Sequence, residues 1–308
     1  MSYLREQINR TLKKIREAKY EEVGKFLKVF PIDTTELHPD DELFTWYSSE
    51  FKGDSLITDT LSTDIPKGEL LNKPHTGKLL NALNSFSVST DELAQAKRKG
   101  TDIRTQKANG VRKKNLKAID EIVFLGKKEL QIEGILTHQN ITRFGIEDIV
   151  TGVDNLYTAI NEGKNKEVLT ILNSIASATS ELPDCDIYSD TMLMPTTLYN
   201  LLNNTVYNNM TGQTILKVFT AGNDKIKNVY PLKECLGVGT ATAEKDDVIV
   251  CFKKDIDLIK VDLPVESQEG DITKEGFSYT IPLRSKSAGV RIMELKSVVI
   301  AEIGKVSA

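Results

Sequence analysis

The sequence has little of several features that mark common functional classes. Among its 308 residues are only three cysteines, Cys185, Cys235 and Cys251, and they form no Cys-x-x-Cys pair. This excludes a disulfide framework, and we expect reduced thiols. No stretch approaches the roughly 18 consecutive apolar residues of a membrane-spanning helix, so we expect no membrane partner. The N-terminus MSYLREQINRTLKKIREAKY is charged throughout and has no apolar signal region, which predicts synthesis and use in a cytoplasm.

Motifs that commonly carry catalysis or bind metals are also missing. The three histidines, His38, His75 and His138, lie far apart, and none has a second His or a Cys at ligand spacing. No Gly-x-Ser-x-Gly elbow is present. The segment LGVGTATAEKDD has a Gly-x-Gly step but no third glycine and leads into an expected strand, so we favour a turn over a phosphate-binding loop. We therefore expect no enzymatic activity, no cofactor and no metal.

Positive and negative charges are present in an uneven order, in a chain whose formal net charge is −4. Residues 1–30 contain eight basic and four acidic residues, residues 31–90 four and ten, and residues 91–121 nine and five. This order predicts segments that complement one another, within a chain or between copies. It differs from the single basic face of a dedicated DNA-binding protein.

Residues 3–28 have the spacing of an amphipathic helix that ends before Pro31. Its apolar stripe must be covered either by its own domain or by a neighbouring copy, and the sequence leaves both open. The candidate subunit-interface residues in this arm are Leu4, Ile8, Leu12 and Ile15.

The segment that follows is proline-rich and acidic. We expect strands over residues 43–58 and 78–88, joined by a turn-rich connection, with little apolar material for a core. A two-stranded ribbon alone is marginal in water, so it should lie on another surface. Trp46 and Phe51 are interpreted as anchors against a neighbouring copy, in preference to a base-stacking platform.

Residues 97–117, KRKGTDIRTQKANGVRKKNLK, contain nine Lys or Arg residues and one acid, Asp102. They lie in a helical pattern from about 91 to 123, which Gly100 and Gly110 weaken. We interpret this segment as the polar middle of a strut helix, whose charge meets an acidic neighbouring ribbon, DNA, or both. The candidate charge-complementary or DNA-facing residues are Lys97, Arg98, Lys99, Arg104, Lys107, Arg112, Lys113 and Lys114.

The remaining sequence predicts an α+β arrangement. Residues 146–162 and 166–178 are expected to be helical, and Pro195 to open a further helix. Residues 248–264 and the last forty residues are expected to supply strands with late antiparallel pairing.

Three stretches, read in order, resemble one family. They are SVSTDELAQAKRKGTDIRTQKANGVRKKNLKAIDEIVFLGKKELQIEGILTHQNI at 87–141, SDTMLMPTTLYNLL at 189–202, and YTIPLRSKSAGVRIMELKSVVIAEI at 279–303. Each is weak alone, but their order and spacing are similar to those of the major capsid proteins of tailed bacteriophages, in the branch closest to encapsulin shells. The likeness covers most of residues 40–303.

The resemblance implies an α+β fold in four parts. These are an N-terminal arm at 1–40, an extended hairpin called the E-loop at 41–88, a peripheral domain at 89–144 and 264–308 with a long spine helix at about 91–123, and an axial domain at 145–263. It implies that the arm and the E-loop lie on adjacent subunits, which gives the amphipathic arm and the coreless ribbon a place to pack.

The function that the resemblance implies is structural. Copies of the chain would assemble as pentamers and hexamers into an icosahedral virion capsid around double-stranded DNA, in the cytoplasm of a bacterial host. Its partners would be itself, the packaged DNA, and portal, scaffold or accessory capsid proteins. One alternative is an encapsulin nanocompartment that encloses a cargo enzyme, and another is a soluble DNA-binding protein that uses the basic helix.

Overall fold

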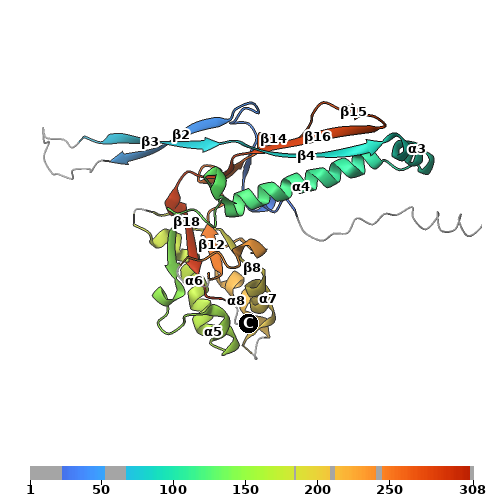
Figure 1. Cartoon of the computed structure of the whole chain (residues 1–308). Helices are drawn as coiled ribbons and strands as arrows, with labels where there is room; N and C mark the ends of the chain where they lie inside the picture. Colours follow the sequence, from blue (N-terminus) through green and yellow to red (C-terminus); the bar gives the residue numbers. More distant parts are fainter. Residues whose placement is uncertain (1–22, 53–66, 184, 209–211, 241–244, 306–308) are drawn as a thin grey trace, which may run out of the picture.

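The computed structural model of the chain describes residues 23–52, 67–183, 185–208, 212–240 and 245–305, and of residues 49–52 and 71 it describes the backbone only. Figure 1 shows a long upper layer above a more compact body. In the upper layer, a two-stranded ribbon extends to one side, and a sheet with a long helix along it extends to the other.

Helices and 3-10 turns alternate with strands along most of the described chain. The α-helices are α2 (Phe26–Val29), α3 (Thr90–Lys99), α4 (Ile103–Leu125), α5 (Leu156–Asn161), α6 (Asn165–Glu181), α7 (Thr196–Asn204) and α8 (Ile215–Gly222). The 3-10 turns are η1 (Lys128–Leu130), η2 (Ile146–Asp148), η3 (Lys233–Cys235) and η4 (Leu295–Ser297). The strands up to the body sheet are β1 (Ile32–Asp33), β2 (Leu43–Lys52), β3 (Glu69–Lys78), β4 (Leu80–Ser89), β5 (Gly126–Lys127), β6 (Ile132–Glu133), β7 (Thr142–Gly145) and β8 (Thr191–Pro195). The later strands are β9 (Val206–Asn208), β10 (Gln213–Thr214), β11 (Asn228–Leu232), β12 (Val248–Phe252), β13 (Ile259–Asp262), β14 (Val265–Glu269), β15 (Thr273–Glu275), β16 (Ser278–Ser287), β17 (Gly289–Ile292) and β18 (Val298–Glu302).

A mixed five-stranded sheet, in the order β11–β8–β12–β18–β7, forms the centre of the body. Its inner strands read TMLMP, VIVCF and VVIAE, and every residue in them is buried. Continuous runs of this kind are typical of strands that are covered on both faces.

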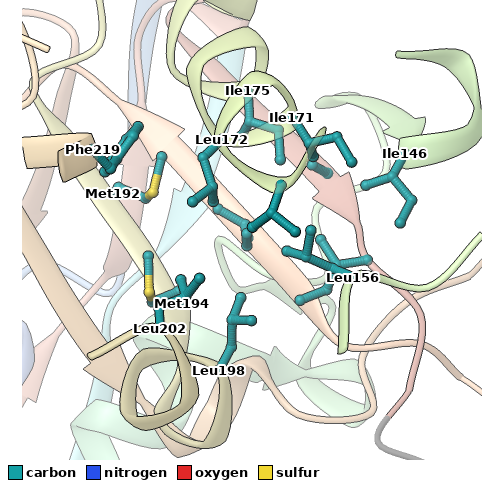
Figure 2. Packing of buried hydrophobic residues seen from close by; sticks show 14 of the residues in the cluster. Ile146, Leu156, Ile171, Leu172, Ile175, Met192, Met194, Leu198, Leu202 and Phe219 are labelled. Atoms are coloured by element: carbon teal, nitrogen blue, oxygen red, sulfur yellow. The ribbon is translucent and has the colours of Figure 1, made fainter. Parts of the chain in front are cut away.

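Helices α5 to α8 cover one face of this sheet. The buried residues of α6 include Val168, Ile171, Leu172 and Ile175, the spacing of one helical face. They meet side chains from β8 and α7 in the largest core, and Figure 2 shows Leu172, Met194 and Leu198 among the residues of this core.

The other face of the sheet is covered by the end of α4 and by α2. Phe30 stacks on Phe252 of β12 with ring centroids 5.3 Å apart, and Phe124 of α4 lies 5.9 Å from Phe30. Phe26, Val29 and Phe30 are at most 1% exposed. The expected arm over residues 1–40 therefore does not extend as one separate unit to residue 40, because residues 26–30 are part of the body's own core.

The sheet of the upper layer is built on strands β4 and β16, which pair antiparallel over ten residues. Strands β14 and β15 pair with β16, and α4 packs against this sheet through a small core that includes Phe86, Val111 and Leu283. This core positions α4 as a strut along the sheet, as the sequence predicts.

The strut is not the single helix predicted over residues 91–123. It is interrupted at Gly100, whose φ of 63° is left-handed and ends α3, and Asp102 then caps α4 by accepting a hydrogen bond from the Thr105 amide. A left-handed C-cap glycine followed by an Asp N-cap is the usual way to end one helix and begin another. The start predicted at about residue 91 is confirmed, since α3 begins at Thr90 and Ser89 and Glu92 form a capping box.

The pairing of the ribbon also differs from the prediction. The second ribbon strand was predicted over residues 78–88. Strand β2 instead pairs with β3 (Glu69–Lys78), whereas residues 80–89 form β4 and pair with β16. Two strands that follow one another without a turn can belong to different sheets, which periodicity alone does not reveal.

The C-terminal strand β18 lies between β12 and β7 in the body sheet, whereas β13 pairs with β17 and β1 in a separate three-stranded sheet. On one side, residues 298–302 therefore pair with β12, which was expected in the axial domain, although the sequence assigned residues 298–302 to the peripheral domain. The division into four named parts otherwise stays a prediction.

Candidate subunit interface

The β2–β3 ribbon has two chemically different faces. In β2, Phe44, Trp46 and Ser48 are partly buried, and they alternate with the exposed residues Leu43, Thr45 and Tyr47. The alternation follows from the two-residue period of a strand. We call the face of Phe44 and Trp46 the inner face of the ribbon, and that of Leu43 and Tyr47 its outer face.

The outer face carries large apolar side chains that the chain itself does not cover. Leu43 and Tyr47 are each 67% exposed, and Leu70 of β3 is 60% exposed. Leu70 pairs in register with Phe51, whose side chain lies outside the described atoms. Sequence reasoning missed Leu43, Tyr47 and Leu70, although the strict alternation of LFTWYSS contains the signal that separates the two faces.

The inner face is an aromatic stack on which the predicted anchor Trp46 lies. The Trp46 ring is 5.5 Å from Phe44 and 5.3 Å from His75, with interplanar angles of 25° and 22°. Phe44 lies across Gly77 of β3, where an added Cβ would be 2.4 Å from the ring. The inner face thus turns toward its own chain, and contact of Trp46 with a neighbouring copy stays a prediction.

A cluster of buried charges lies at the root of the ribbon, in the sheet of β1, β13 and β17. Lys260 and Arg291 are direct cross-strand partners, and like charges in that position repel. Three carboxylates compensate them. Lys260 Nζ lies 2.8 Å from Asp33 and also contacts Glu36, while Arg291 Nη2 lies 2.6 Å from Glu36 and 2.8 Å from Asp262.

The acids of this cluster respond differently to their surroundings. Burial alone would raise the pKa of Asp33, but hydrogen bonds from Lys260 and from the amides of Thr35 and Glu36 hold it well below its usual range. The hydrogen bond from Lys260 lowers the pKa of Glu36 and outweighs its burial. Burial raises the pKa of Asp262, and the charge of Arg291 offsets this only in part. The cluster therefore depends most on Asp33 and Glu36 as stable anions.

The same three acids could in principle hold a cation, because one oxygen from each lies within 4.8 Å of the others. In the described part of the chain no other group of acids, cysteines and histidines has this spacing. Lys260 and Arg291 already donate hydrogen bonds to all three acids, so two cations of the chain itself offset most of this negative charge.

Arg291 also joins the cluster to the ribbon. Its guanidinium carbon lies 5.4 Å from the Phe44 ring centroid and 5.8 Å from that of Trp46, within the usual range of a cation–π contact. Nearby, the buried Lys286 donates hydrogen bonds to the carbonyls of Pro39 and Asp41, which fixes the chain just before β2.

The structure separates the predicted basic residues of the strut into two groups. Arg104 pairs with Glu269 of β14, Lys107 with Glu92 and the Ser87 carbonyl, and Arg112 with Glu266 of β14. These three charges bind α4 to its own sheet.

Lys97, Arg98 and Lys99 form the last turn of α3 and are exposed, and among the described residues no ion pair is recorded for them. Lys113 and Lys114, on α4, are exposed as well. The three basic residues of α3 lie at the C-terminal, negative end of the helix dipole, where positive charge stabilises the helix. They remain available to a partner.

The first described residues of the chain are held on α4 by hydrogen bonds to Asp120. Asp120 of α4 accepts hydrogen bonds from the amides of Gly24 and Phe26, at 2.7 and 3.0 Å, and burial raises its pKa. The predicted arm residues Leu4, Ile8, Leu12 and Ile15 lie outside the described residues.

The loop before β12 fits the turn that the sequence favours. The Gly237 amide donates to Asp247 at 2.8 Å, and the Thr240 amide donates to Glu302 at 2.9 Å. These backbone amides, which a phosphate-binding loop would offer to its ligand, thus already donate hydrogen bonds to carboxylates of the same chain. All three cysteines are buried, and burial raises the pKa of Cys235 and Cys251, which is the opposite of what a reactive thiol needs.

Among the residues that the structure describes, no helix has both the length and the apolar character to cross a membrane. Two described features that have chemical groups without a partner in the chain are the apolar outer face of the ribbon and the basic end of α3. Both suit contact with another macromolecule.

Comparison with solved structures identifies the fold. The capsid of Myoviridae phage XM1 is 15% identical, with a TM-score of 0.69 over 94% of this chain and 95% of that chain. The capsid of an empty GTA particle is 9% identical, with a TM-score of 0.62 over 94% and 93%. The virus-like particle of Pyrococcus furiosus is 14% identical, with a TM-score of 0.54 over 90% and 92%.

At these identities the likeness establishes the α+β capsid fold, in agreement with the sequence-based prediction. No curated protein sequence matches significantly. The sequence model of the family described as "Major capsid protein" matches residues 53–302, which is most of the chain. The chain therefore belongs to the major capsid protein family of tailed phages, and its role is that of a structural subunit of a capsid shell.

Proposed function

We propose that copies of this chain assemble as pentamers and hexamers and close into an icosahedral shell around double-stranded DNA. The chain contributes surface and shape to the shell and performs no catalysis. Assembly takes place in the cytoplasm of a bacterial host, with portal, scaffold or accessory capsid proteins as further partners.

The outer face of the ribbon is the observation that carries this proposal. Leu43, Tyr47 and Leu70 are exposed on a two-stranded element that projects from the upper layer. An isolated ribbon gains little stability from its own strands, and apolar side chains gathered on one face favour burial against a partner. Repetition of this contact around a closed ring fits a homo-oligomeric shell.

The contents of the shell are inferred from charge. Arg104, Lys107 and Arg112 are paired within the chain, so they have little capacity for DNA. Lys97, Arg98 and Lys99 are the described residues best suited to meet either DNA phosphates or the acidic ribbon of a neighbour.

A nanocompartment that encloses an enzyme is the alternative, and the likeness to a virus-like particle favours keeping it. The contents of purified particles distinguish the two functions, because DNA supports the capsid and a cargo protein supports the nanocompartment. A soluble DNA-binding protein is disfavoured, because three basic residues of α4 already form ion pairs with acids of the same chain.

Electron microscopy of the purified full chain tests the assembly directly. We expect closed particles of regular diameter from the wild type. The double variant Leu43→Ser and Tyr47→Ser should remain a folded subunit but lose at least about tenfold in particle yield, because its docking face becomes polar.

Ile256→Ser is the matched control for this experiment. Ile256 is 44% exposed, and it lies in the body between β12 and β13, so its change alters an apolar surface residue without altering the ribbon. Equal particle yields from the double variant and the wild type would exclude the outer face as the docking surface.

A further inference from the structure

The direction of the ribbon depends on a small number of contacts at its root. Within the described parts of the chain, each of its two strands pairs only with the other, so the backbone ladder ends within the ribbon. In Figure 1 the ribbon extends away from both the body and the β4–β16 sheet. A contact that fixes its root therefore decides where its outer face points.

Arg291 lies at this root with its polar edge already bound. Nη2 donates to both Glu36 and Asp262, and the side chain is 3% exposed. The buried Nε has no hydrogen-bond acceptor among the described residues. The guanidinium thus has a fixed position on β17 and an unused plane, which is the geometry that stacking on an aromatic ring requires.

The inner face of the ribbon supplies that aromatic surface from both strands. Phe44 and Trp46 of β2 lie 5.4 and 5.8 Å from the guanidinium carbon, and Trp46 stacks on His75 of β3. Gly77 leaves the space that the Phe44 ring fills. One cation therefore contacts a stack that includes both strands.

We propose that Arg291 is a positioning residue for shell assembly, which clamps the Phe44–Trp46 stack and so holds the outer face of the ribbon in the direction that a second copy requires. This rests on the proposed function in one respect only, namely that the outer face docks on a second copy. The clamp itself is a property of the single subunit.

The first experiment measures amide hydrogen exchange in unassembled full-length subunits. In the Phe44→Leu and Trp46→Leu double variant, amides of residues 43–48 and 74–78 should exchange on the order of tenfold faster, whereas those of β12 and β18 should not change. Tyr47→Leu is the matched control, because it alters the outer face and should leave the exchange of the ribbon root unchanged.

Trp46 gives a second readout, because it is the only tryptophan in the chain. Arg291→Lys keeps the positive charge but lacks the planar guanidinium. Its Trp46 fluorescence should shift to longer wavelength and be quenched more strongly by acrylamide. Gly77→Ala should do the same without removing any charged or aromatic group, because its methyl displaces the Phe44 ring.

The diameters of assembled particles connect the clamp to the shell. Clamp variants should give a broader distribution of diameters than the wild type. Unchanged ribbon exchange in the double variant, or faster exchange that extends equally to β12 and β18, would overturn the proposal. If the wild type forms no particles, the proposed function fails, yet the exchange experiment still decides whether the clamp exists.

Discussion

Glu36 is the most consequential single acid at the root of the ribbon. Its carboxylate contacts both Lys260 and Arg291, although its side chain is 47% exposed while theirs are at most 9% exposed. An exposed ion pair contributes little, but here the same carboxylate serves two buried cations that repel each other across paired strands. The removal of Glu36 therefore takes away the one acid that contacts both cations, and leaves each of them with a single carboxylate partner.

This arrangement predicts a specific dependence of stability on pH. The folded pKa of Glu36 lies below its usual value of 4.5, so the unfolded chain binds the proton more tightly. The stability that Glu36 contributes is fully present above that value and is lost as the pH falls through the folded pKa. Asp33 has the same sign, whereas the raised pKa of Asp262 opposes it.

We expect Glu36→Gln to lower the free energy of unfolding at ~pH 7 by roughly 1 kcal/mol, a value already reduced for solvent screening. The difference from the wild type should shrink as the pH falls below 4.5, because the wild-type carboxyl is then protonated as well. Urea denaturation at several pH values measures this. A difference that stays constant from neutral to acidic pH would show that Glu36 acts through packing and not through its charge.

Elements of both the upper layer and the body show what local sequence does and does not determine. The capping box at Ser89, the amphipathic α6 and the buried strands β8, β12 and β18 follow from patterns of a few residues. The sequence indicated that Gly100 weakens the helix, but it did not predict that α3 ends there. A glycine inside a helix and a glycine that caps its C-terminus differ only in the residues that follow.

Strand partners were not predictable in the same way. The choice of β16 as the partner of β4, and of β7 and β12 as the partners of β18, joins residues far apart in the sequence. The candidate interface shares this limit. Trp46 was identified as an anchor, but Gly77 could be placed opposite Phe44, and Arg291 beside the ribbon, only once the topology was known.

The strut offers a comparison between two triplets of basic residues. Lys97→Gln, Arg98→Gln and Lys99→Gln together change charges that have no recorded ion pair, whereas Arg104→Gln, Lys107→Gln and Arg112→Gln break three recorded pairs. We expect the second set to lower the urea midpoint of the subunit more than the first set, which loses only the favourable interaction with the α3 dipole.

If the end of α3 faces DNA, the first set should also weaken binding of the subunit to duplex DNA. The slope of log affinity against log salt should fall by roughly one unit for each lost phosphate contact. Lost particle assembly with an unchanged salt slope would assign these residues to a neighbouring subunit instead. A loss of DNA affinity confined to the second set would contradict this division of the strut.

At the scale of the whole molecule, the body and the segment before it form one folding unit. The body sheet is covered on one face by α5 to α8 and on the other by α4 together with residues 26–30. Strand β1 then pairs with β13, so the chain remains attached to the body up to the ribbon root. The boundary between the predicted arm and the body therefore lies before Gly24, whose amide is bound by Asp120.

This boundary predicts opposite outcomes for two deletions. A chain that lacks residues 1–22 keeps every described core side chain, so the subunit should fold with unchanged cooperativity. A chain that lacks residues 1–30 loses Phe26, Val29 and Phe30, which are at most 1% exposed. Truncation of one buried Phe costs about 3–5 kcal/mol, and a typical domain has only about 5–15 kcal/mol in total.

We therefore expect the longer deletion to give a subunit that is unfolded or loosely packed, and the shorter deletion to give a folded subunit with impaired shell assembly. Near-ultraviolet circular dichroism and urea denaturation report the first effect, and electron microscopy reports the second. Asp120→Asn in the full chain is the control, because it weakens the attachment at Gly24 without removing a core side chain. Normal shells from the shorter deletion would show that residues 1–22 have no role in assembly, and a cooperatively folded longer deletion would place the boundary of the body after Phe30.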